Sequence, residues 1–349
     1  MVLHYPGGID LTEFGIQIPV APDRTQQVLD ALLADRELKA TEQTWLLGPD
    51  GSSISREDLL RVHAADYVER GFSDGVDGLL EEVFELIGED GSYHRYDPAV
   101  ARSPLSQLFA LWLHWMAGTY QCGREALRSG FCFYLGGGAH HGHYDFGHGF
   151  CIFNDMVTAI RRLQVEGAAR TAWVIDVDAH KGDGTAALTA DDPTVATLSI
   201  HMERSWPLDL PAYRNGAPAP WLIPSTVDVG LGPGEEARYL PELRGALGRL
   251  ALRPFPEIAY IVDGADPYEH DELPSTADMR LTLDQLRERD RMIYRFLAER
   301  GIPQAWLMSG GYGRRAWEPF AAFLGERLRT VTATGGGTAG PAPAAGSGT

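Results

Sequence analysis

Short apolar runs alternate along this chain with longer segments in which apolar residues recur every three or four positions. Five runs rich in β-branched or aromatic residues predict buried strands, at 131–135, 171–178, 194–201, 257–264 and 304–310. Helical periodicity lies between several of them, at 154–167, 233–253 and 281–301. This rhythm predicts an α/β fold: a single domain with a mostly parallel β-sheet and helices on both faces.

The two ends of the chain differ from this middle part. The first 130 residues look mainly helical, with apolar periodicity over 23–38, 55–72 and 103–130. From Thr332 the sequence is rich in Gly, Ala, Pro and Ser without periodicity, a composition typical of disorder. We therefore expect one domain over residues 1–331 and a disordered tail over 332–349.

Charge and cysteine content narrow the function classes. The chain has 30 Lys plus Arg against 48 Asp plus Glu, and this formal net charge of -18 disfavours nucleic-acid or membrane partners and suits a basic ligand. Three cysteines without a CxxC motif signal neither a disulfide framework nor a thiolate zinc site. No signal-peptide pattern opens the sequence, and its longest apolar run is too short for a bilayer. We expect a cytoplasmic protein.

Polar, glycine-containing segments follow the predicted strands. They read GGGAHHGHYDFGHGF after 131–135, AHKGDG after 171–178, ADPYEHDEL after 257–264 and GYGRR after 304–310. Open parallel sheets bind ligands at the carboxyl ends of their strands, so these segments are expected to converge. Together they supply metal ligands, bases and one phenol.

The segment VIDVDAHKGDG indicates a bound cation. Asp176, Asp178 and His180 alternate with apolar residues, so an extended backbone would point all three the same way. Two carboxylates and an imidazole on one face repel one another unless a cation lies between them. Asp178, His180 and Asp266 would bind one divalent ion and leave a position open for water, as in catalytic zinc sites. The alternatives are a salt-bridged strand end and an iron(II) site.

The adjacent pair His140 and His141 suggests a general base and a general acid. In each histidine, the ring nitrogen that faces away from the substrate would need a carboxylate partner to fix the tautomer. Asp176 and Asp183 are the acids in these segments that are not assigned to the metal. Tyr312, flanked by glycines at a strand end, could stabilise a developing oxyanion. The alternatives are an ordinary polar loop for the histidines and a residue at the edge of the core for the tyrosine.

These motifs resemble the histone deacetylase family, the zinc-dependent members of the arginase-deacetylase fold, over about residues 20 to 325. GGGAHHGHYDFGHGFCIFNDM is similar to the family's Gly-Gly-x-His-His segment, and DVDAHKGDGTA to its Asp-x-Asp-x-His strand. GADPYEHDEL, SGGYG and the early RVHAADYVER also match, in the same order. The sequence DAHKGDGTA is more similar to bacterial members of the family than to the animal nuclear enzymes.

The resemblance assigns a role to each candidate residue. It implies one zinc ion held by Asp178, His180 and Asp266, and a polarising hydroxyl on Tyr312. It implies two histidine–carboxylate pairs, His140 with Asp176 and His141 with Asp183. It further implies a structural potassium ion near Asp176, Asp178, His180, Ser199 and Ile200. The narrow substrate tunnel would be walled by Gly149, Phe150 and Trp206.

Two departures from the family bear on substrate and packing. Lys181 stands where the family usually has His or Gln, and alternation turns it away from the metal face, so we expect it to pair with a nearby acid. Leu273 lies at a rim position where the family's polyamine deacetylases carry an acid. We expect this apolar residue to pack against the backbone or stem of an acyl-lysine, although Glu272 lies next to it.

The sequence therefore predicts a zinc-dependent deacylase that hydrolyses the amide of acyl-lysine in proteins or peptides. The alternative substrates are acetylpolyamines and other small acyl-amines. A rival enzyme is an arginase-like binuclear manganese hydrolase, because Asp178, His180 and Asp183 have a similar spacing, although acids for a second ion are lacking. A rival of another class is a catalytically silent acyl-lysine binding module.

Overall fold

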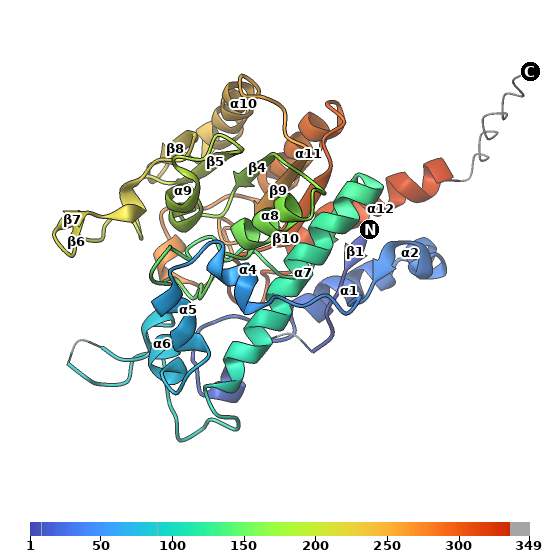
Figure 1. The fold of residues 1–349 in the computed structure, drawn as a ribbon. Coiled ribbons are helices and arrows are strands. Elements are labelled where there is room, and N and C mark those ends of the chain that lie inside the picture. The colour runs from blue at the N-terminus through green and yellow to red at the C-terminus, as the bar shows by residue number, and fades with distance from the viewer. Residues whose placement is uncertain (8, 89, 336–349) are drawn as a thin grey trace, which may run out of the picture.

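The computed structural model describes residues 1–7, 9–88 and 90–335, with side chains through 330, and has an eight-stranded sheet at its centre (Figure 1). The strand order is β2-β1-β3-β10-β9-β4-β5-β8, and all neighbours in it are parallel. The strands are β1 (Val2–Leu3), β2 (Leu46–Leu47), β3 (Phe131–Tyr134), β4 (Ala172–Asp176), β5 (Val195–Met202), β8 (Val227–Leu231), β9 (Ile258–Asp263) and β10 (Gln304–Met308). The pair β6 (Tyr213–Arg214) and β7 (Ala217–Pro218) forms a separate antiparallel hairpin.

Helices cover both faces of this sheet, which confirms the predicted α/β architecture. The α-helices are α1 (Arg24–Leu33), α2 (Arg36–Ala40), α3 (Glu42–Trp45), α4 (Arg56–Leu60), α5 (Ala65–Gly71), α6 (Val76–Val83), α7 (Gln107–Ser129), α8 (Asp155–Val165), α9 (Asp183–Thr189), α10 (Tyr239–Leu250), α11 (Leu283–Ala298) and α12 (Glu318–Gly335). Short 3-10 helices are η1 (Leu11–Phe14), η2 (Pro220–Leu222), η3 (Glu236–Arg238) and η4 (Pro274–Thr276). In Figure 1, α7 and α8 lie on one face, and α10, α11 and α12 on the other.

Alternate residues of the central strands build two hydrophobic cores, because these strands are buried on both faces. Tyr260 and Leu307 pack with α7 and α8, while Trp173 and Trp306 pack with α10, α11 and α12. Helix α7 passes closely over β9, since a Cβ at Gly123 would lie 1.9 Å from the Tyr260 hydroxyl. The sheet is therefore a rigid platform for the loops at its carboxyl edge.

Several element boundaries differ from the predictions. The strand expected over 171–178 ends at Asp176, and residues 178–180 form a bend. The prediction that an extended backbone carries Asp176, Asp178 and His180 on one face was therefore wrong. The helix expected over 55–72 is broken into α4 and α5, and the one expected over 23–38 into α1 and α2. Strands β1, β2 and β8 were not predicted. The first two are only two residues long, too short to show a period.

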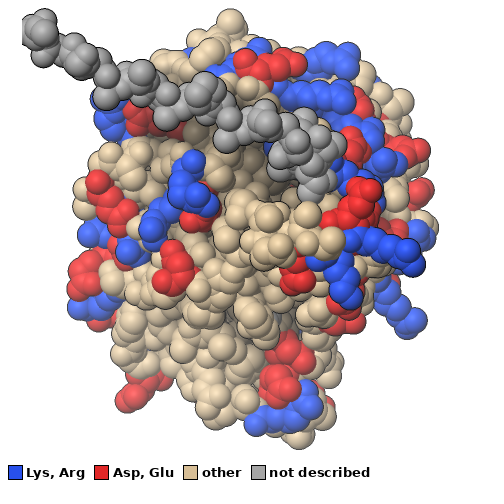
Figure 2. Space-filling model, turned by 90° about the vertical axis from the view of Figure 1, so that its right-hand side faces the viewer, with Lys and Arg blue, Asp and Glu red and all other residues tan. Residues whose placement is uncertain are grey.

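The expected tail at 332–349 begins inside α12, which continues to Gly335, and residues 336–349 lie outside the described part of the chain. Among the helices described, none combines the length and apolarity needed to cross a membrane. On the face shown in Figure 2, acidic and basic side chains are interspersed around uncharged surface.

Candidate active site

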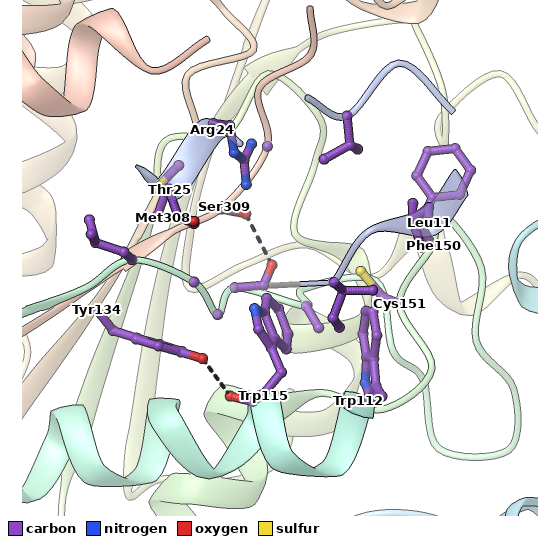
Figure 3. A pocket seen from close by; sticks show the side chains of 18 of the residues that line it. Leu11, Arg24, Thr25, Trp112, Trp115, Tyr134, Phe150, Cys151, Met308 and Ser309 are labelled. Carbon is purple, nitrogen blue, oxygen red and sulfur yellow. Dashed lines mark hydrogen bonds between the residues drawn. The ribbon is translucent and has the colours of Figure 1, made fainter. Parts of the chain in front are cut away.

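The loops that follow β3, β4 and β10 converge on one cavity of about 350 Å³ (Figure 3). Its lining includes His140, His141, Asp178, His180 and Tyr312, together with apolar side chains from α7 and the N-terminal segment. The predicted convergence of these strand ends is thus confirmed, and Asp266, after β9, lies in contact with the same group. Ser309, directly after β10, donates from its hydroxyl to the carbonyl of Gly138 at 3.1 Å and joins two of the loops.

The glycine-rich loop before the two histidines is held by a carboxylate at the start of α8. Asp155 accepts hydrogen bonds from the backbone N–H groups of Gly138 (2.9 Å) and Ala139 (2.7 Å). Gly137 and Gly138 have φ values of +87° and +88°, which side chains rarely adopt, so the sharp turn requires glycine. This turn directs His140 and His141 into the cavity.

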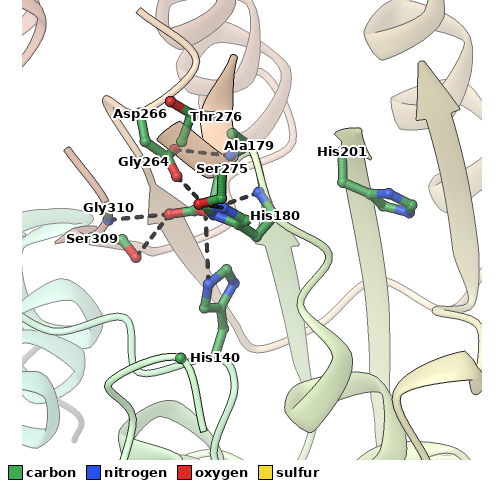
Figure 4. A network of polar contacts seen from close by, with 12 residues as sticks. His140, Ala179, His180, His201, Gly264, Asp266, Ser275, Thr276, Ser309 and Gly310 are labelled. Atoms are coloured by element: carbon green, nitrogen blue, oxygen red, sulfur yellow. Dashed lines mark hydrogen bonds and ion pairs between the residues drawn. The ribbon is translucent and has the colours of Figure 1, made fainter. Parts of the chain in front are cut away.

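Asp178, His180 and Asp266 form a compact buried group (Figure 4). His180 Nδ1 lies 3.2 Å from Asp178 Oδ1 and 3.0 Å from Asp266 Oδ2. Burial lowers the pKa of His180, but the two carboxylates raise it to about 10. Burial and the neighbouring Asp178 raise the pKa of Asp266 above its usual range. Two carboxylates held this close favour either a shared proton or a cation between them.

This group fits a divalent metal ion. Ligand atoms at 2.0–2.2 Å around a tetrahedral zinc lie about 3.3–3.6 Å from one another, slightly farther apart than the 3.2 and 3.0 Å observed here. Within the described residues, the fully buried Asp266 Oδ2 makes no well-aligned hydrogen bond and has only the close contact to His180 Nδ1 at 3.0 Å. A Cβ at Gly310 would lie 2.3 Å from Asp178 Oδ2, so only glycine leaves space beside the carboxylates. Ser275 Oγ, 3.1 Å from His180 Nε2, fixes the ring so that Nδ1 faces them.

The two histidines form the carboxylate pairs that the sequence predicted. His140 Nδ1 lies 2.7 Å from Asp176 Oδ2, His141 Nδ1 lies 2.6 Å from Asp183 Oδ1, and the two rings are 3.9 Å apart. Burial lowers the pKa of His140, but Asp176 and Asp178 raise it to about 9. A cation held by Asp178 would oppose that rise. Burial and the neighbouring His140 hold the pKa of His141 well below its usual range.

Asp183 accepts from two further imidazoles that the sequence reasoning did not assign. Its Oδ2 lies 3.0 Å from His143 Nε2 and 2.8 Å from His148 Nε2. Burial raises the pKa of Asp183, but the three histidines together hold it well below its usual range. The side chains of His141, His148 and Asp183 also lie close enough together to contact one metal ion. Their contacts at 2.6 and 2.8 Å are hydrogen-bond lengths, shorter than the spacing around zinc.

Tyr312 is anchored through its backbone by residues far away in sequence. Its N–H donates to Asp271 Oδ2 at 2.7 Å, and Arg24 Nη1 donates to the carbonyl of Gly311 at 2.7 Å. Burial and the carboxylates of Asp266 and Asp178 raise the pKa of Tyr312 well above its usual range. The phenol therefore keeps its proton at neutral pH and can donate a hydrogen bond.

Aromatic side chains flank the reacting groups. The Trp206 ring lies 4.6 Å from the His141 ring, and the Phe150 ring lies 6.5 Å from that of Tyr312. A Cβ at Gly149 would lie 2.3 Å from Trp206, so this approach requires glycine. Gly149 and Phe150 line the cavity, where the resemblance expects tunnel walls, whereas Trp206 packs against His141 and Gly149 and is not part of that lining.

The rim differs from the expectation for Leu273. This side chain is only 6% exposed, because it packs inward while its N–H donates to Asp271 Oδ1 at 2.9 Å. Its neighbour Glu272 is exposed and accepts from the backbone N–H of Arg314 at 3.0 Å. The solvent-facing side chain next to the Tyr312 loop is thus an acid.

Lys181 pairs with an acid as predicted, since its Nζ lies 3.4 Å from Asp228 Oδ2. Ser199 lies opposite Asp176 in the β4–β5 register, near the expected potassium ligands. The Ile200 side chain belongs to the hydrophobic core, which leaves only its backbone for an ion. The potassium site stays a prediction.

The buried side chain of Arg289 holds the backbone next to two residues of the candidate metal site, Asp178 and Asp266. Arg289 Nη1 donates to the carbonyls of Val177 (3.1 Å) and Gly264 (2.7 Å), and the guanidinium pairs with Asp263 and Asp290. Sequence reasoning missed it because the helical pattern of α11 was assessed only for its apolar positions. Asp263, the last residue of β9, forms an ion pair with Arg289 and is not one of the candidate metal ligands. Among the described residues, no further acid joins the metal group to hold a second ion.

Comparisons with known proteins agree with this arrangement. The histone deacetylase domain family matches residues 18–324. Histone deacetylase 2 of Arabidopsis thaliana is 31% identical over 198 residues, covering 56% of this chain and 48% of that protein. The acetoin utilization protein AcuC of Bacillus subtilis is 29% identical over 286 residues, covering 75% of this chain and 65% of the relative. The chain thus spans about half to two thirds of the length of these relatives.

Solved structures show the same fold. The crystal structure of the HDA15 HD domain superimposes with a TM-score of 0.64 at 18% identity, covering 95% of this chain and 92% of the other. An HDAC homolog from Aquifex aeolicus gives the same TM-score and identity, covering 96% of this chain and 83% of that one. With the family match over most of its length, the chain belongs to the histone deacetylase family.

Proposed function

We propose that this protein is a zinc-dependent deacylase that hydrolyses the amide of acyl-lysine in proteins or peptides. The observation that carries the proposal is the single cavity that joins the buried Asp178 and His180 to His140, His141 and Tyr312. Family membership supports the reaction class, and the donor set supports the metal. One zinc ion per chain would be held by Asp178, His180 and Asp266.

When bound, zinc supplies a Lewis acid for the amide carbonyl and lowers the pKa of water. His140, held through Nδ1 by Asp176, presents Nε2 to the cavity and takes a proton from the attacking water. Tyr312 keeps its hydroxyl proton and donates a hydrogen bond to the oxyanion that develops as the amide becomes tetrahedral. Burial and a charged His140 both depress the pKa of His141, so a neutral His140 acting as base leaves His141, held through Nδ1 by Asp183, better able to carry a second proton on Nε2. His141 gives that proton to the departing amine, and the proton that His140 took from the water returns to His141 through solvent before the next turnover.

The surroundings of these groups fit a lysine side chain. Phe150, which lines the cavity, would lie along its methylenes, and Trp206, packed against His141, would help to exclude water from the reacting amide. We further propose a structural potassium ion near Asp176 and Ser199. The cytoplasmic location also belongs to the proposal and agrees with three cysteines that are all free and buried.

A second candidate substrate class is favoured by Glu272. This exposed carboxylate beside the Tyr312 loop could meet the distant ammonium of an acetylated polyamine or another small acyl-amine. The net charge of -18 suits that basic ligand equally well. Leu273, the residue at the expected rim position, is apolar and buried, so it provides no ion pair or hydrogen bond for such an ammonium.

The test compares kcat/KM for an acetyl-lysine peptide with that for acetylated putrescine and spermidine. Wild type is expected to prefer the peptide. Glu272→Gln removes the exposed negative charge but keeps an acceptor for the N–H of Arg314, and it should lower kcat/KM for the polyamines further while leaving that for the peptide unchanged. A wild type at least tenfold better on an acetylated polyamine, about 1.4 kcal/mol in transition-state binding, would overturn the peptide assignment. Binding of both substrates without turnover would instead indicate a silent acyl-lysine binding module.

A further inference from the structure

Asp183, the partner of His141, makes different contacts from Asp176, the partner of His140. Among the residues that the structure describes, the second oxygen of Asp176 accepts only from the backbone N–H of Asp178, at 3.1 Å. The second oxygen of Asp183 accepts from two imidazoles, those of His143 at 3.0 Å and His148 at 2.8 Å. Asp183 and His143 are buried, and the His148 side chain is only 12% exposed. Three histidines thus share one carboxylate.

Both additional rings are fixed in direction by aromatic neighbours. The His143 ring stacks on Phe146 with centroids 4.4 Å apart and planes 8° apart. The His148 ring lies 4.9 Å from Trp206 and 6.2 Å from Trp221. Packing therefore holds each Nε2 toward the carboxylate independently of the hydrogen bond itself.

We propose that His143 and His148 are positioning residues that hold Oδ2 of Asp183, so that Oδ1 stays aligned with Nδ1 of His141. A carboxylate offers about four acceptor sites and turns freely when only one is used. Two donors on Oδ2 fix its plane, which obliges His141 to donate from Nδ1 and to present Nε2 to the substrate amine. This inference rests on the proposed function of His141.

Two substitutions at His148 separate the hydrogen bond from the packing. His148→Phe keeps an aromatic ring against Trp206 and Trp221 but removes the donor. His148→Gln loses the ring but can place an amide N–H near the position of Nε2. His143→Phe and His143→Gln form the same matched pair beside Phe146. Supporting partners of active-site groups typically contribute about 10- to 100-fold to activity.

For His148→Phe we expect kcat on an acetyl-lysine peptide to fall about tenfold with KM and zinc content unchanged, and His148→Gln to recover most of it. A packing role predicts the reverse order, with the phenylalanine variant the better enzyme. Equal loss in both variants, or kcat within twofold of wild type in His148→Phe, would overturn the proposal. Two zinc ions in wild type and one in His148→Phe would overturn it in favour of a second metal site.

A readout that needs no turnover keeps this inference separate from the proposed function. The N–H proton shared by His141 and Asp183 should give a downfield proton resonance in wild type that disappears in His141→Ala. We expect it to broaden or shift in His148→Phe and to return in His148→Gln. If it is unchanged in His148→Phe, then Asp183 is aligned without His148, whatever reaction the protein catalyses.

Discussion

His63 couples the stability of the active-site loop to pH. Its buried ring accepts at Nε2 from the N–H of Asn154 (3.2 Å) and donates from Nδ1 to the carbonyl of His143 (2.7 Å). Only the neutral imidazole satisfies both contacts. Burial lowers the pKa of His63 to about 4, because the carbonyl of His143 offsets only part of the desolvation.

The sign and size of the effect follow from this shift. In the unfolded chain His63 has the ordinary histidine pKa of 6.5, so between pH 6.5 and about 4 the unfolded state binds a proton that the native state does not. The stability that the neutral His63 confers is therefore complete above about pH 6.5 and is lost as the pH falls toward 4. With about 1.4 kcal/mol per pKa unit, the free energy of unfolding should drop by about 2 kcal/mol between pH 7 and pH 5.

The assay is urea unfolding, followed by tryptophan fluorescence, of wild type and His63→Asn at both pH values. Asparagine keeps a donor for the carbonyl of His143 but does not titrate. The variant should be less stable at pH 7 because it loses packing against Phe153, yet its loss between pH 7 and pH 5 should be about 2 kcal/mol smaller. His94→Asn, at an exposed loop position, is the control and should follow wild type. Equal pH-dependence in wild type and His63→Asn would refute the reasoning.

Three further outcomes test the candidate site. Tyr312→Phe should retain zinc but lose roughly 10²- to 10³-fold in kcat, the usual effect of removing one oxyanion donor, and a near wild-type kcat would exclude Tyr312 from the mechanism. Elemental analysis should find one zinc per chain, lost in His180→Ala, whereas two manganese ions in the active form would favour the arginase-like alternative. Gly310→Ala should lose zinc while keeping its far-UV circular dichroism, because the new Cβ meets Asp178 Oδ2 at 2.3 Å.

The sequence was most informative where a strand ends in a polar loop. Apolar runs followed by glycine and ionisable residues predicted which loops converge, and the pairing of His140 with Asp176 is as expected. The stated reason for the metal face was wrong, because the backbone bends after Asp176 and is not extended through His180. Asp178 and His180 nevertheless meet Asp266, since the neighbouring strands β4 and β9 end side by side.

Support for the site from distant parts of the chain could not be predicted. Arg24 reaches the carbonyl of Gly311 across 287 positions, and periodicity assigned the helix carrying Arg24 only an apolar face. His143 and His148 lie inside the segment GGGAHHGHYDFGHGF, but nothing in their spacing shows that both contact Asp183. Such contacts depend on the relative placement of loops, which local patterns do not encode.

The buried Arg289 bears on how the proposed zinc ion would enter its site. By donating to the carbonyls of Val177 and Gly264, one guanidinium ties together the backbone segments that carry Asp178 and Asp266. Its helix, α11, is part of the hydrophobic core, so the distance between these two carboxylates is set by the folded interior and not by the ion. After a chelator removes the ion, Asp178 and Asp266 should therefore keep their positions. The protein should then bind zinc again without refolding, at a rate set by diffusion of the ion into the site.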